Sequence, residues 1–121
     1  MAEYLIYFNQ QWVGDHTEEW FRGRGPLARA VVDEIKAAGV YVFTGGLEED
    51  VDAAFSADST SGALVITDGP FIESKEFLAG LIMVEAAHLD AALAIAQELR
   101  QTMTGGAIEV RPVREWWFRG A

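Results

Sequence analysis

Three short segments of this chain are apolar on both of their alternating faces. They are residues 4–8, 40–44 and 81–84. Successive side chains of a β-strand point to opposite faces of its sheet, so a strand of this kind needs apolar cover on both sides. The sequence therefore predicts a sheet that is covered on both faces, which limits how a chain of this length can fold.

Two further segments show the 3.6-residue period of an amphipathic helix. We expect the first to run from Pro26 to Gly39, because proline suits a first helical turn and glycine a helix end. A separate helical turn capped by Thr17 is expected before it, interrupted by Gly23 and Gly25. The two apolar stripes comprise Leu27, Val31, Ile35 and Ala38, and then Leu89, Leu93, Ala96 and Leu99.

The order of the predicted elements defines the fold class. It is strand, helix, strand, hairpin, strand, helix, strand, in which residues 53–57 and 63–67 flank the polar turn 58–62. We predict an α+β protein with a ferredoxin-like βαββαβ plan and an extra hairpin, forming one domain over residues 1–121. Two helices cover only one face of such a sheet. A second copy is the expected cover for the other face, which gives a homodimer.

The composition excludes several classes of partner. With 19 acidic and 9 basic residues, the net charge of -10 disfavours nucleic acid and anionic membrane surfaces. No cysteine is present, and no apolar run reaches the ~20 residues of a membrane helix. The acids Glu48, Glu49, Asp50 and Asp52 lack the spacing of a calcium loop. We expect a cytoplasmic protein with no metal and no cofactor.

Residues 68–77 form the densest polar cluster beside predicted core. Asp68-Gly69 is a favoured turn pair, and a carboxylate near an ammonium favours both charges, which suits a polar ligand better than a general base. The alternative is a plain turn with a solvated surface pair. The candidate ligand-binding residues are Asp68, Gly69, Pro70, Phe71, Glu73 and Lys75.

These residues also carry a family resemblance. Asp68-Gly69-Pro70-Phe71, followed by an apolar strand at residues 80–85 and by Glu109-Val110-Arg111-Pro112-Val113, resembles the DGPF branch of the YCII-related family. The resemblance spans roughly the last half of the chain and the helix end at residues 37–39. It implies a dimeric α/β barrel. In many such proteins a histidine near the start of the first helix has been proposed as part of an acid–base site. Here that position falls near Leu27 or Ala28, which argues against a histidine-centred mechanism.

Three functions are compatible with these residues. The first is binding, or also transforming, a small polar molecule in a cleft between sheet and helix that the Asp68 motif borders. Its pocket would be lined by some of Tyr7, Phe43, Phe71, Phe77 and Met83. The alternative, which the resemblance implies, is a non-catalytic interaction protein associated with sigma factors or transcription. The third, a haem protein, rests on analogy between folds alone.

Two other features have competing interpretations. Asp68 and His88 are weak catalytic candidates, and His88 at the start of the second helix is more simply a capping residue. The aromatic residues Trp116-Trp117-Phe118 favour a packing or dimer-contact tail over a ligand lid.

Overall fold

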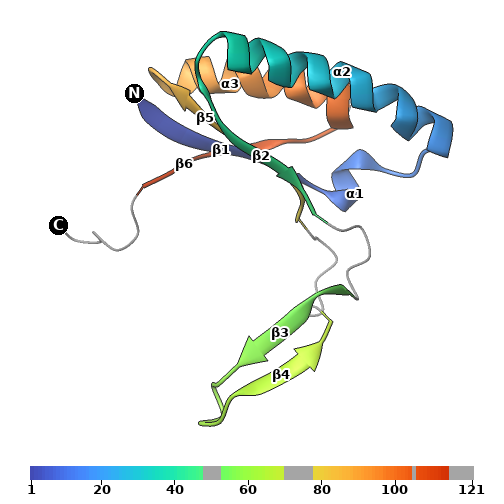
Figure 1. Ribbon diagram of the computed structural model, residues 1–121, viewed down its shortest axis with the longest axis vertical. Helices are drawn as coiled ribbons and strands as arrows, with labels where there is room; N and C mark the ends of the chain where they lie inside the picture. The colour runs from blue at the N-terminus through green and yellow to red at the C-terminus, as the bar shows by residue number, and fades with distance from the viewer. Residues whose placement is uncertain (48–52, 70–77, 105, 115–121) are drawn as a thin grey trace.

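The computed structural model describes residues 1–47, 53–69, 78–104 and 106–114. The tail at residues 116–118 and the acidic loop at residues 48–52 lie outside this part. Figure 1 shows the elements, which follow one another as β1 (Ala2–Asn9), α1 (Gln10–Val13), α2 (Glu18–Ala37), β2 (Tyr41–Gly46), β3 (Phe55–Asp58), β4 (Val65–Asp68), β5 (Leu78–Ala86), α3 (Leu89–Leu99), the π-helical turn η2 (Arg100–Thr104) and β6 (Glu109–Pro112).

Four of the strands form one antiparallel sheet in the order β2-β5-β1-β6. Strands β3 and β4 form a separate two-stranded sheet, inserted between β2 and β5. Without this hairpin, the elements follow the ferredoxin-like βαββαβ plan. The predicted α+β class, with its extra hairpin, is confirmed.

Helix α2 is one continuous helix, where the sequence indicated a short turn and then a new helix at Pro26. It begins after Thr17, whose side chain accepts a hydrogen bond from the Trp20 N–H at 3.1 Å. It ends before Gly39, whose φ of 75° suits a glycine. The stacking of Arg24 over Trp20 ties the first two turns together across Gly23. Local helix breakers were outweighed here by capping and by side-chain contacts.

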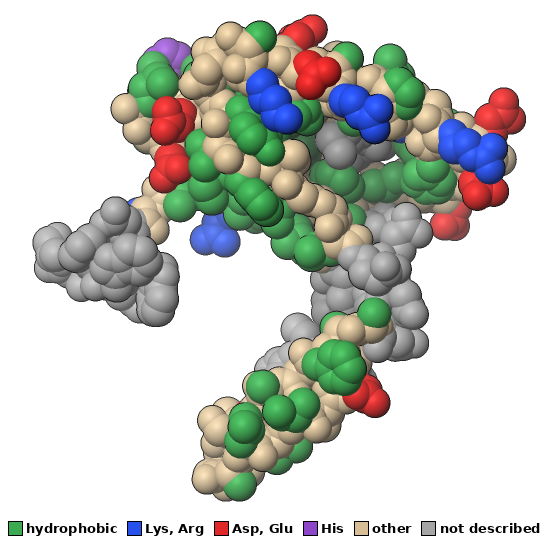
Figure 2. Space-filling model, viewed as in Figure 1, with side chains coloured by type: hydrophobic (Ala, Val, Ile, Leu, Met, Phe, Trp, Pro, Cys, Tyr) green, Lys and Arg blue, Asp and Glu red, His purple; other side chains and the backbone are tan. Residues whose placement is uncertain are grey.

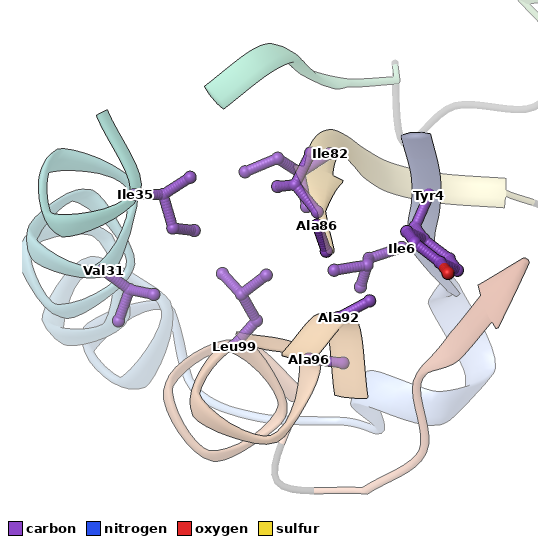
Figure 3. Close-up of a cluster of buried hydrophobic side chains, with 10 residues drawn as sticks. Tyr4, Ile6, Val31, Ile35, Ile82, Ala86, Ala92, Ala96 and Leu99 are labelled. Atoms are coloured by element: carbon purple, nitrogen blue, oxygen red, sulfur yellow. The ribbon is translucent and has the colours of Figure 1, made fainter. Parts of the chain in front are cut away.

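The main core lies between one face of the four-stranded sheet and the helices α2 and α3. Figure 3 shows these buried side chains converging from both layers. Val31 and Ile35 are buried on α2 as predicted, whereas Leu27 is exposed. Helix α3 buries Ala92, Ala96 and Leu99, and exposes Leu89 and Leu93. The stripe of α3 is therefore centred on its small residues, which lets the helix approach the sheet closely.

The other face of the sheet carries no helix in the described residues (Figure 1). Its side chains alternate with the buried ones and include Leu5, Tyr7, Leu81 and Met83. They are half-buried, and Phe43, opposite Met83, is 54% exposed. This apolar surface, defined by these five residues, is called the open face below. No helix of the described residues is long and apolar enough to cross a membrane.

Candidate functional site

A cavity of about 390 Å³ lies between α2 and the helix-covered face of the sheet. The sheet contributes Ile6, Phe8 and Ile82, and α2 contributes Ala28 and Val32. The remaining lining residues are Arg29, Thr44, Gly45, Gly46, Ala79, Gly80, Leu81, Leu99 and Ile108. The lining is therefore almost wholly apolar, as is usual for small-molecule sites.

A second hollow of about 290 Å³ continues the first along α2. The two share Phe8, Ala28, Gly46 and Ala79 as lining residues. The second hollow also reaches Val13, Trp20, Phe21, Arg24, Gly25 and Leu47. Together they form one groove, called the α2 groove below.

Glycine residues in the sheet, which have no side chains, create this space. Gly46 lies directly opposite Gly80 where β2 pairs with β5, so neither strand fills the volume beneath α2 at this end. The ring of Phe8 lies over Gly80, because a Cβ added there would come within 2.8 Å of the Phe8 Cζ. On α2 the facing residue is the small Ala28. Register and residue size together leave the cavity open.

The polar groups of the α2 groove are few and mostly cationic. Thr44 is already engaged, since its hydroxyl donates to the Leu81 carbonyl at 3.1 Å. Arg29 is exposed at the rim of the larger cavity. Arg24 lies with its Cζ 4.6 Å from the centroid of the Trp20 ring in the smaller one. A ligand with an apolar body and an anionic group would match this lining.

His16 belongs to the same end of the groove. Its ring stacks on Trp20 with centroids 3.6 Å apart and planes 10° from parallel. Its Nε2 lies 2.8 Å from the Val13 carbonyl, which only accepts, so Nε2 carries a proton and donates. His16 thus packs on Trp20 while its Nε2 is held by the Val13 carbonyl.

The described part of the Asp68 motif forms the base of the hairpin. Asp68 is exposed at the end of β4, opposite Phe55. Gly69 has a φ of 93°, its N–H donates to the Ala54 carbonyl at 2.6 Å, and its carbonyl accepts from the Ser56 hydroxyl at 2.8 Å. These bonds show a turn that needs glycine. Neither Asp68 nor Gly69 lines the two hollows. Pro70, Phe71, Glu73 and Lys75 lie outside the described residues.

His88 is the N-cap of α3, as its position in the sequence indicated. Its Nδ1 accepts a hydrogen bond from the Ala91 N–H at 3.2 Å. It lines neither hollow of the groove. Its described contacts therefore support capping and supply no catalytic partner. Among the described residues, no group of three or more His, Asp or Glu side chains could hold a metal ion.

The two hollows are not lined by Tyr7, Phe43 or Met83, three of the five residues of which some were expected, from the sequence, to line the pocket. Tyr7, Phe43 and Met83 lie on the open face, whereas the α2 groove lies on the opposite side of the sheet. The lining residues Phe8 and Ile82 are their sequence neighbours. Alternation along a strand identifies two faces, but it does not say which one faces the helices. Phe71 and Phe77 lie outside the described residues.

A second polar cluster lies on the sheet face opposite the helices, and the sequence did not reveal it. The Tyr7 hydroxyl donates to a Glu109 carboxylate oxygen, and Arg111 also lies close to Tyr7. The hydrogen bond to Glu109, followed by burial and the Glu109 charge, raises the pKa of Tyr7 above its usual value of 10.0, against a smaller opposing effect of Arg111. Tyr7 therefore stays protonated and acts as a donor.

Comparison with known proteins gives a consistent assignment. The chain is 39% identical over 62 residues to an uncharacterised protein of Rhizobium meliloti (strain 1021), a match that covers 50% of this chain and 50% of that protein. The chain thus matches only half the length of this relative. Residues 24–117 match the profile of the YCII-related domain, and this stretch contains most of α2, the whole hairpin and β6. The chain therefore belongs to the YCII-related family.

Proposed function

We propose that this protein binds a small organic molecule in the α2 groove, with the apolar body of the ligand between Phe8 and Val32. An anionic group of the ligand would lie at Arg29 or Arg24. The single observation that supports this most is the apolar cavity of about 390 Å³, which holds a molecule of metabolite size. A mostly apolar ligand with one charged group fits this lining better than the small polar molecule that the motif indicated.

The Asp68 motif is proposed to border this site, because the segments that connect the hairpin to β2 and β5 adjoin residues of the groove in the sequence. Residues 48–52 follow Leu47, and residues 70–77 precede Leu78 and Ala79. Gly46, Leu47 and Ala79 line the groove. Leu47, which precedes the first connection in the sequence, and Ala79, which comes two residues after the second, therefore both lie at the groove. This supports a role of the motif at the site without requiring that Asp68 itself touch the ligand.

A homodimer is the second part of the proposal. The open face exposes apolar side chains from three strands, and soluble monomers rarely leave such a patch of more than ~300–600 Å² uncovered. Two copies packed through their open faces would form a barrel with a groove on each outer side. Sedimentation equilibrium tests this: we expect twice the 13.3 kDa of one chain, and a stable single chain at micromolar concentration would contradict it.

Binding in the groove is testable with 1-anilinonaphthalene-8-sulfonate, a fluorescent probe with apolar rings and one anionic group. We expect wild type to bind it, Ala28→Phe to lose binding because the new ring fills the cavity, and Arg29→Ala to bind it more weakly. The matched controls are Ala30→Phe and Arg22→Ala. Ala30 lies two residues along α2 and does not line the groove, and Arg22 pairs with Glu18 at 3.5 Å. Equal binding by Ala28→Phe and Ala30→Phe would exclude the groove.

A further inference from the structure

The β3–β4 hairpin has one apolar face that the described residues leave uncovered. Phe55 lies opposite Asp68, and Ala57 lies opposite Ile66, so these four side chains share a face. Phe55 is 72% exposed and Ile66 is 65% exposed. The other face carries Ser56, Asp58 and Thr67, with Val65. Figure 2 shows apolar side chains at the surface along this hairpin.

Such a hairpin is poorly stable by itself. A two-stranded sheet in water is marginal unless a third strand or another layer covers its apolar face. Within the described residues β3 and β4 pair only with each other. The turn is nevertheless well defined, because the Asp58 carboxylate accepts from the Thr60 N–H at 2.9 Å and the Gly62 N–H donates to the Ser59 carbonyl at 3.0 Å. The part of the chain that the structure describes supplies no cover for Phe55 and Ile66.

We propose that the hairpin is an arm that packs its Phe55 and Ile66 face on a second copy of this chain. The proposal rests on the homodimer proposed above and adds a contact that the sheet packing does not require. Figure 1 shows the hairpin extending from the side of the sheet that faces away from α2 and α3. The arm and the open face therefore lie on the same side of the subunit. A second copy of the chain, which has the same two surfaces, would cover both.

Symmetry and charge locate the contact on the second copy. We place the two copies with their open faces together and with the two-fold axis between them, parallel to the strands. In this arrangement the β2 edge of one copy lies over the β6 edge of the other. The hairpin leaves the sheet from β2, and its residues 53–69 contain Asp58 and Asp68 but no Lys, Arg or His. The β6 edge carries Glu109 and Arg111, and the exposed Arg114 follows it. On this packing, the cations Arg111 and Arg114 are the expected partners of Asp58 and Asp68 of the arm.

Two neighbouring substitutions test the arm. Ile66→Asp places a charge on the apolar face, and Thr67→Asp places the same charge one residue away on the opposite face. Both positions are exposed in one subunit, so neither variant should unfold, which circular dichroism verifies. In sedimentation equilibrium we expect Ile66→Asp to raise the dimer dissociation constant about 100-fold, because both arms lose a buried side chain. Thr67→Asp should leave the constant within about threefold of wild type.

The outcomes separate the arm from the dimer. A monomeric wild type would overturn both proposals. A dimeric wild type with equal constants for Ile66→Asp and Thr67→Asp would overturn the arm alone.

Because the chain has no cysteine, single cysteine variants report the contact directly. A mixture of Ile66→Cys and Arg114→Cys should form a covalent dimer with a short bismaleimide, whereas neither variant alone should. Cross-linking by Ile66→Cys alone, or none in the mixture, would overturn the arm's proposed position.

Discussion

The hydroxyl of Tyr7 donates a hydrogen bond to the carboxylate of Glu109 across directly opposite positions of β1 and β6. The two residues are 102 positions apart in the chain. The bond exists only while the phenol keeps its proton, since ionisation would set two anions against each other. The hydrogen bond to Glu109 is thus the main cause of the raised pKa of Tyr7, and the same bond links the edge strand β6 to the sheet.

Tyr7 should therefore ionise later than an ordinary tyrosine when the protein is titrated with base. A group whose folded pKa is raised contributes stability that is full below its unfolded pKa of about 10 and is lost as the pH rises through the folded pKa. We expect the difference in absorbance at 295 nm between wild type and Tyr7→Phe to have its midpoint above pH 10. Glu109→Gln should move this midpoint back toward 10. A midpoint at 10 in wild type would contradict the assignment.

Gly106 is a position where even one methyl group should destabilise the protein. A Cβ there would lie 2.7 Å from the carbonyl oxygen of Trp12, a backbone atom that cannot move alone. We expect Gly106→Ala to lower the free energy of unfolding by about 1–3 kcal/mol in urea denaturation.

The control for this variant is Gly23→Ala, within α2. A Cβ at Gly23 meets no atom within 4 Å. Alanine is the better helix former, so we expect a gain of about 0.5–1 kcal/mol. If both variants change the free energy of unfolding in the same direction, the close approach of Gly106 to Trp12 does not determine the effect of the Gly106→Ala substitution.

The sequence predicted the fold well because periodicity reports burial directly. The stripe through Val31 and Ile35 and the short apolar segments of β1 and β5 predicted the element order. The hairpin followed from its polar turn. The break before Pro26 was wrong because local propensity was applied to a segment in which Thr17 capping and the Arg24–Trp20 stack act over several turns.

The candidate site was less accessible to sequence reasoning. The α2 groove depends on Gly46 lying opposite Gly80, and Tyr7 meets Glu109 only through the β1–β6 register. Register is a property of paired strands, and no local pattern in either strand specifies its partner residue. A signal was nevertheless present: Gly45, Gly46 and Gly80 interrupt strands that are otherwise apolar, and glycine within a strand often marks a close approach or a space.

His88 should contribute to stability as a cap. Replacing it by alanine removes the acceptor of the Ala91 N–H, and we expect a loss of about 1 kcal/mol in thermal or urea unfolding. His88→Asn should retain most of the stability, because an asparagine side chain accepts at the same position. If both variants instead lost ligand binding at unchanged stability, His88 would belong to a site and not to the helix end.

Phe8 and Gly80 provide a way to narrow the α2 groove without touching its rim. A methyl group at Gly80 would lie 2.8 Å from the far end of the Phe8 ring, and that end can swing aside. The space available to it is the cavity that Phe8 already lines. We expect Gly80→Ala to weaken binding of the naphthalene sulfonate probe several-fold, with a stability change of less than about 1.5 kcal/mol. Gly23→Ala is the control, because Gly23 lines neither hollow of the groove and a Cβ there meets no atom within 4 Å. If Gly80→Ala bound the probe as tightly as Gly23→Ala does, the ring of Phe8 would not limit the site, and the groove would have to extend beyond it.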